Sequence, residues 1–150
     1  RVDADSRSGD SASPRSFSSD IATEGVQSSD KAYIEANRVR VAQGLPPLNR
    51  GHLAQREAFK SSPESLAAAD HWTNVVPMTE TLNQGKRWRT AEERSFRYAT
   101  KLGSVIVEVE PIYPPKPDRL SDGTPIPEAI RRRVISPDGK VLEDRTYPNT

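Results

Sequence analysis

The sequence predicts an α+β fold with antiparallel strands, because its helical and strand signals do not alternate regularly along the 150 residues. The strongest helical signal is an apolar spacing of three and four residues that stops at Gly103. The clearest strand signal is the alternation of valines over residues 104–110. A Pro-Asp-Gly turn at residues 137–139 connects two further predicted strands into a hairpin. The length suits a single domain.

The first half of the chain contains one predicted helix and one predicted strand. The helix begins at Ser29 or Asp30 and ends near Gly44, and the two prolines that follow require extended chain. Residues 71–78 have the β-branched and aromatic content of a strand, which we expect Pro77 to close.

The second half contains the long helix, one strand and the hairpin. Thr90 and Glu93 are able to form a capping box at the start of the helix. The strand after it is expected to end at Pro111, and the hairpin strands span residues 130–135 and 140–147. The predicted buried face of the long helix consists of Trp88, Ala91, Phe96, Ala99 and Leu102.

Composition excludes several kinds of site. The chain has no cysteine, so it has neither a disulfide framework nor a thiolate zinc site, and a metal would need His, amide or carboxylate ligands with water. The low hydrophobic fraction of 33% and the 13 prolines predict a poorly ordered stretch. We expect a disordered tail or linker over residues 1–14 and a folded domain over residues 15–150. No apolar run approaches the roughly 18 residues that cross a bilayer, so we expect no membrane partner.

Several short segments occur in an order that a known family shares. They are residues 15–20 (Arg-Ser-Phe-Ser-Ser-Asp), 49–54 (Asn-Arg-Gly-His-Leu-Ala), 74–77 (Asn-Val-Val-Pro), 82–85 (Leu-Asn-Gln-Gly, before Trp88 and Glu92) and the closing strands from residue 105. Each segment alone is a weak signal, but their order and distances together are specific. Over about residues 15–150 the chain resembles the DNA/RNA non-specific endonucleases, whose ββα-metal (His-Me finger) fold has antiparallel strands and a long helix that carries the metal ligand.

The resemblance implies a metal-dependent phosphodiesterase. His52 would be the general base, since a neutral imidazole can take a proton from water. Asn83 would bind Mg²⁺, or Mn²⁺ as the alternative, and Glu92 would hold metal-bound water. Arg15 and Arg50 would contact phosphate, because a planar guanidinium suits two phosphate oxygens.

Two departures from the family pattern affect this interpretation. Asn49 replaces the usual Asp, which puts the tuning of Arg50 or of the field at the metal in doubt. One additional residue sets Asn83 and Glu92 nine positions apart, or about 900° on an unbroken helix, which places them on opposite faces. We therefore expect the helix to be interrupted near Gly85 or to begin anew at Thr90.

Other residues have weaker assignments. Asn74 either holds backbone near the site or only ends a strand, and His71 is expected to be structural. Arginines 131–133 read first as strand charge. A basic run on the long helix is most often a solvated face, although in a nuclease it could contact the phosphate backbone. It comprises Lys86, Arg87 and Arg89, which we take as candidate nucleic-acid contacts, together with Arg94, Arg97 and Lys101.

The leading interpretation is a Mg²⁺-dependent endonuclease that acts on DNA, with RNA as a further substrate. The net charge of +1 is weak support for such a partner, but residues 1–30 hold six acids and three arginines, which leaves about +4 on the rest. By analogy we expect the toxin domain of a larger secreted antibacterial protein, delivered into a target cell and neutralised by a cognate immunity protein. The alternative is a catalytically impaired nuclease fold that binds nucleic acid or protein. A zinc-dependent HNH nuclease would need more His or Asp ligands.

Overall fold

The computed structural model describes residues 2–3, 30–55, 58, 63–64 and 74–150. Every strand pair in these ranges is antiparallel, which confirms the predicted α+β class. In chain order the elements are β1 (Val2–Asp3), α1 (Asp30–Ala42), β2 (Leu48–His52), β3 (Val75–Thr79), α3 (Glu80–Asn83), α4 (Lys86–Leu102), β4 (Ser104–Ile112), β5 (Ala129–Ile135) and β6 (Val141–Pro148).

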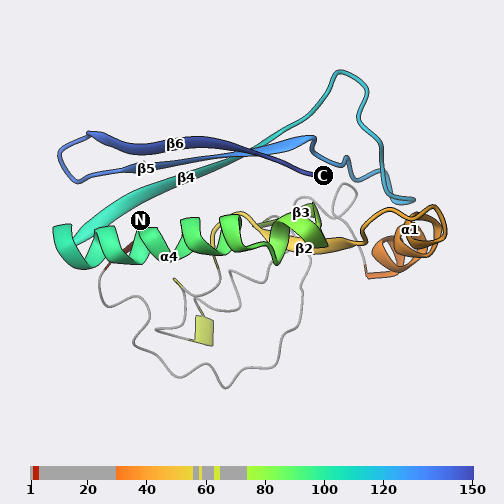
Figure 1. Cartoon of the computed structure of the whole chain (residues 1–150), viewed down its shortest axis with the longest axis horizontal. Helices are drawn as coiled ribbons and strands as arrows, with labels where there is room; N and C mark the ends of the chain where they lie inside the picture. Colours follow the sequence, from red (N-terminus) through yellow and green to blue (C-terminus); the bar gives the residue numbers. More distant parts are fainter. Residues whose placement is uncertain (1, 4–29, 56–57, 59–62, 65–73) are drawn as a thin grey trace.

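The strands form two separate sheets. One has the order β1-β4-β5-β6, and the other is the pair β2-β3. The long helix α4 runs along the larger sheet, β2 and β3 lie near its first turns, and α1 lies at the end of the molecule (Figure 1). The β2-β3 pair, followed by α3 and α4, is the ββα unit of the predicted fold.

Helix α4 buries one face, as its periodicity predicts. Trp88 packs in one hydrophobic cluster with Met78, Ile130 and Tyr147, and it meets the Tyr147 ring edge-on at 5.3 Å between centroids. Farther along the helix, Phe96 joins a second cluster against the sheet. The first cluster therefore joins both sheets to the helix at the end where the predicted site residues lie.

The structure confirms the predicted end of α4 but not its predicted start. Gly103 stops the helix with φ +88°, as expected. Leu102, which we assigned to the buried face, is 41% exposed because it lies in the last turn beside that stop. The capping box of Thr90 and Glu93 is wrong: α4 begins at Lys86 after Gly85, which provides no side-chain cap. Thr90 is thus already beyond the first turn.

Two prolines that were expected to close strands lie inside them instead. Pro77 pairs with Arg50 within the two-stranded sheet, and Pro111 pairs with Ile130 within β4. Proline lacks the N–H donor but is tolerated where that side of the strand has no neighbour. Among the described residues this holds for β3 and also for β4 beyond its short pairing with β1, which involves Ser104 and Val105 of β4.

Among the remaining elements, α1 and the β5–β6 hairpin were predicted, whereas strand β2 was not. Helix α1 spans Asp30–Ala42 with Gly44 at φ +73° after it, and β5 and β6 form the predicted hairpin. Within the expected tail, Val2–Asp3 form strand β1 against β4, so that expectation is wrong for these two residues. The rest of the tail lies outside the described residues, and its boundary at residue 15 stays a prediction. The described helices include none long and apolar enough to cross a membrane.

We predict that Gly51→Ala destabilises the protein. A Cβ at this position would lie 2.6 Å from Cβ and 2.7 Å from Cε of Met78, and Met78 is fully buried. Overpacking of this kind costs about 1–3 kcal/mol of unfolding free energy. Thermal or urea unfolding measures the cost, and an unchanged transition would show that β2 and β3 can separate without penalty.

Candidate active site

A groove of about 810 Å³ collects four of the predicted site residues from β2 and the α3–α4 region. Asn49 and Arg50 come from β2, Asn83 from the end of α3, and Arg89 from the first turn of α4. Asp30, Tyr33, Ile34 and Asn37 of α1 complete the wall together with Leu48 and Gln84. Side chains that are more than 30 positions apart in the sequence therefore share one cavity.

Asn83 is the last residue of α3, and the helix is interrupted directly after it. Gln84 and Gly85 separate α3 from α4, which confirms the predicted interruption. The same break places Asn83 on α3, so the expectation that the long helix itself carries this residue is wrong. Steric crowding requires glycine at position 85, because a Cβ would lie 2.4 Å from the carbonyl oxygen of Thr81. The Leu-Asn-Gln-Gly segment thus makes a tight break that presents the partly exposed Asn83 side chain to the groove.

His52 is the last residue of β2 and pairs with Val75. It is 9% exposed, and it lies two residues after Arg50, so both side chains leave the same face of the strand. Asn74 holds the chain directly after it. The Asn74 side chain accepts a hydrogen bond from the Ala54 N–H at 2.9 Å and donates one to the Ala54 carbonyl at 3.0 Å. Of the two roles left open for Asn74, the structure supports holding backbone near the site.

Arg50 forms a charged hydrogen bond with Asp30, the first residue of α1. Both side chains are exposed to solvent, at 38% and 62%, so this pair is screened and exchangeable. Asp30 was read from the sequence only as a helix start, and its place in the groove was missed. A carboxylate therefore does reach Arg50, but it comes from α1 and not from position 49.

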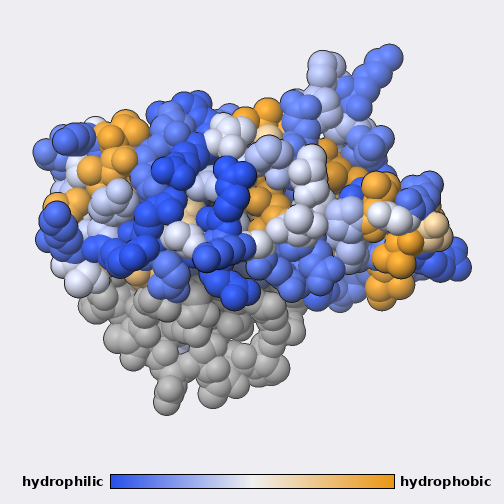
Figure 2. Space-filling view, in the orientation of Figure 1, coloured by the Kyte–Doolittle hydropathy of each residue, from blue (hydrophilic) through white to orange (hydrophobic). Residues whose placement is uncertain are grey.

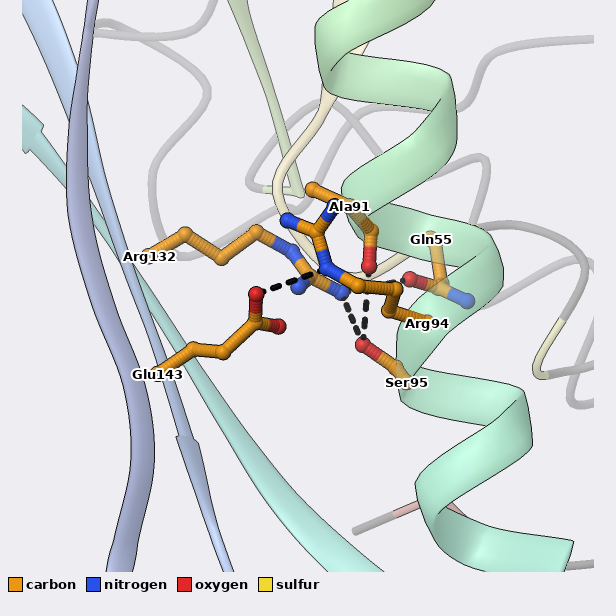
Figure 3. Close-up of polar contacts among 6 residues, drawn as sticks. All are labelled: Gln55, Ala91, Arg94, Ser95, Arg132 and Glu143. Atoms are coloured by element: carbon orange, nitrogen blue, oxygen red, sulfur yellow. Dashed lines mark hydrogen bonds and ion pairs between the residues drawn. The ribbon is translucent and has the colours of Figure 1, made fainter.

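Glu92 lies on the second turn of α4, partly buried, above a polar network. The network connects β5, α4 and the chain that follows His52 (Figure 3). Gln55 donates to the Glu92 carbonyl oxygen at 3.4 Å and accepts from the Arg132 guanidinium at 3.0 Å. The same guanidinium donates to Ser95, whose hydroxyl also donates to the Ala91 carbonyl at 3.3 Å.

Arg132 is the one buried member of the three arginines that we read as strand charge. Its side chain is 3% exposed, and burial lowers its pKa while the charges of Glu92, Tyr147 and Glu143 act to raise it. Its neighbours Arg131 and Arg133 point to the other face and pair with Asp144 and Glu108. The sequence did contain a signal, since Arg132 occupies the inward position between Ile130 and Val134, which are both fully buried.

The first turn of α4 is basic, with Lys86, Arg87 and Arg89 all exposed. The helix dipole favours acidic residues at this end, and the turn contains none. These cations therefore do not serve helix stability. Arg89 faces the groove, whereas Arg87 lies over the Tyr147 ring with its Cζ atom 5.9 Å from the centroid.

The arrangement suits a cation that keeps most of its water. In the ranges that the structure describes, no group of three or more His, Cys, Asp or Glu side chains is placed to hold a metal. Asn83 offers an amide oxygen in a groove large enough for water and phosphate. This arrangement fits Mg²⁺, which keeps several waters, better than it fits Zn²⁺, which is usually held by three or four protein ligands.

A family model for DNA/RNA non-specific endonucleases matches residues 1–149. The chain belongs to this family. Arg15 and His71 lie outside the described residues, so the phosphate role of the first and the structural role of the second remain predictions. No curated protein sequence matches the chain.

The EndoG structure agrees with this family assignment at the level of the fold. The EndoG chain in the crystal structure of the EndoG/EndoGI complex superposes with a TM-score of 0.79 at 18% identity, over 99% of this chain and 64% of that one. The present chain therefore spans less than two thirds of the length of the EndoG chain. A structure of NucA from Streptococcus agalactiae with magnesium bound matches at a TM-score of 0.48 and 24% identity, over 69% of this chain and 47% of that chain.

We predict that Arg132→Met lowers stability although it keeps most of the side-chain volume. The acceptors on Gln55 and Ser95 would be left buried and without their donor, which costs about 1–3 kcal/mol. Arg131→Met on the same strand is the matched control, because Arg131 pairs with Asp144 in solvent and should change the melting temperature little. Equal melting temperatures for both variants would show that the network is dispensable.

Proposed function

We propose that this chain is a Mg²⁺-dependent endonuclease that hydrolyses phosphodiester bonds of DNA without reading base sequence, with RNA as a further substrate. The observation that carries the proposal is the groove, in which Arg50, Asn83 and Arg89 converge in a member of this endonuclease family. Contacts to phosphates position a nucleic acid but carry no sequence information, so such a site suits non-specific cleavage.

Each residue has a distinct task in the proposed reaction. His52 takes a proton from the attacking water, and the hydrogen bonds of Asn74 to Ala54 keep the chain beside it in place. Arg50 and Arg89 bind phosphate oxygens, and Arg50 exchanges the Asp30 carboxylate for phosphate when substrate enters. Asn83 holds Mg²⁺, which when bound stabilises negative charge on the phosphate and the leaving oxygen. Glu92 orients water near that ion.

Arg15 is proposed as a further phosphate contact, and Asn49 as a neutral member of the groove wall. The neutral amide at position 49 also favours the alternative function, a nuclease fold with impaired catalysis that binds nucleic acid or a protein. Cleavage separates the two, because a pure binding module produces no metal-dependent cuts.

We also propose a protein inhibitor and a toxin setting, in which the chain is delivered into a target cell and a cognate immunity protein covers the groove. Support for an inhibitor comes from the EndoG/EndoGI structure, whose subject is inhibition of EndoG. Toxin delivery rests on analogy with the family.

We predict that the protein cuts plasmid DNA with Mg²⁺ and that EDTA abolishes cutting. His52→Ala should lower the rate about 10²–10⁴-fold through loss of the general base, and Asn83→Ala should require more Mg²⁺. Lys140→Ala, at an exposed turn position, is the control variant. Intact DNA and RNA with folded wild-type protein would favour the binding module instead.

We predict that Asn49→Asp lowers the Mg²⁺ concentration needed for half-maximal cleavage severalfold. A carboxylate in the groove adds negative charge beside Asn83 and restores the residue usual in the family. Gln84→Glu introduces the same charge into the same groove and controls for its general effect. An identical Mg²⁺ dependence for Asn49→Asp and the wild type would show that position 49 does not influence the metal.

A further inference from the structure

Basic side chains form a row along one face of α4, beginning three residues after Asn83. Positions 86, 90, 94, 97 and 101 recur at intervals of three and four, so they share one helical face. Four of the five are basic, and the fifth is a threonine. They are Lys86, Thr90, Arg94, Arg97 and Lys101.

Strand β6 adds a further cation to this row. Arg145 pairs in register with Arg132, whose buried side chain points toward α4, so Arg145 leaves the sheet on the same side. There it lines a pocket of about 230 Å³ together with Lys86, Arg87, Thr90, Arg94 and Tyr147. Figure 2 shows strongly hydrophilic side chains gathered over α4 and the adjoining edge of the sheet.

Most of these charges remain available to a ligand. Arg94 is neutralised by Glu143 at 2.7 Å. Among the described residues no ion pair involves Lys86, Arg97, Lys101 or Arg145, all of which are exposed. Arg87 is held over the Tyr147 ring and keeps its charge, and the exposed Glu93 is the acid that borders the row.

The dimensions fit a nucleic-acid backbone. The fifteen steps of about 1.5 Å from Lys86 to Lys101 correspond to about 22 Å of helix, which is the length of about six base pairs of duplex DNA at 3.4 Å each. We propose that this basic stripe, made of Lys86, Arg87, Arg97 and Lys101 of α4 with Arg145 of β6, binds backbone phosphates of the nucleic acid that flank the cleaved bond. The inference rests on the proposed function, and it extends the substrate contact from the groove to the α4–β6 edge.

The test compares two double variants that each remove one arginine and one lysine. Lys101→Ala/Arg145→Ala removes charges from the basic stripe, whereas Arg38→Ala/Lys116→Ala removes exposed charges from α1 and from the loop after β4. Binding of a fluorescent 20-base-pair duplex is measured in EDTA, so that no cleavage occurs, over about 50–200 mM salt. Circular dichroism checks that both variants are folded.

Loss of two phosphate contacts should reduce the slope of log affinity against log salt by about 1.8 and weaken binding at low salt about tenfold or more. The control should keep the wild-type slope. Equal losses of affinity in the two variants would mean that only total charge matters, which contradicts the proposal. Absence of detectable duplex binding by the wild type would contradict it as well. Because binding is measured without metal, plasmid cutting with Mg²⁺ is a separate readout. If the wild type cuts DNA but the two double variants have the same salt slope, only the proposed phosphate contacts of the basic stripe are refuted. If the salt slopes differ but the wild type does not cut, only the proposed nuclease activity is refuted.

Discussion

The buried guanidinium of Arg132 is the interaction on which the placement of the candidate site depends. An arginine that is removed from water is tolerated only when its donors are satisfied, because burial of an unpaired charge costs several kcal/mol. Gln55 and Ser95 are two of its partners, and they belong to the chain after His52 and to α4. The sheet, the helix and the loop beyond the proposed general base must therefore keep one relative arrangement.

A second set of hydrogen bonds fixes the side of the groove that contains Asn83. The Asn149 side chain accepts from the Thr79 N–H at 2.8 Å and donates to the carbonyls of Pro77 and Pro127 at 3.1 and 2.7 Å. Thr79 in turn caps α3 by accepting from the Leu82 N–H at 3.2 Å. The end of the chain thus anchors the strand and the short helix that lead to Asn83, so the site relies on segments from across the sequence.

The cations of this protein fall into three physical situations. Arg132 is buried and structural, Arg50 is exposed and paired with the carboxylate of Asp30, and most of the basic stripe takes part in no ion pair among the described residues. This gradation explains why a net charge of only +1 is compatible with a nucleic-acid partner. Asp30 and Glu143 neutralise Arg50 and Arg94, but among the described residues no ion pair involves Arg89 of the groove or Lys86, Arg97, Lys101 and Arg145 of the α4–β6 edge.

The sequence by itself determined the class of fold, most of the face that α4 buries and the hairpin, because these follow from local spacing and backbone geometry. Together with the roles that the family resemblance implies for Asn83 and Glu92, it also predicted the break near Gly85. It also singled out Asn49, Arg50 and Asn83 through the family motifs. Tertiary structure alone decided that Asp30 pairs with Arg50, that Gln55 and Ser95 accept hydrogen bonds from Arg132, and that Pro77 continues a strand. These outcomes depend on which segments pack together, and contacts between residues 20 or more positions apart leave little trace in local sequence pattern.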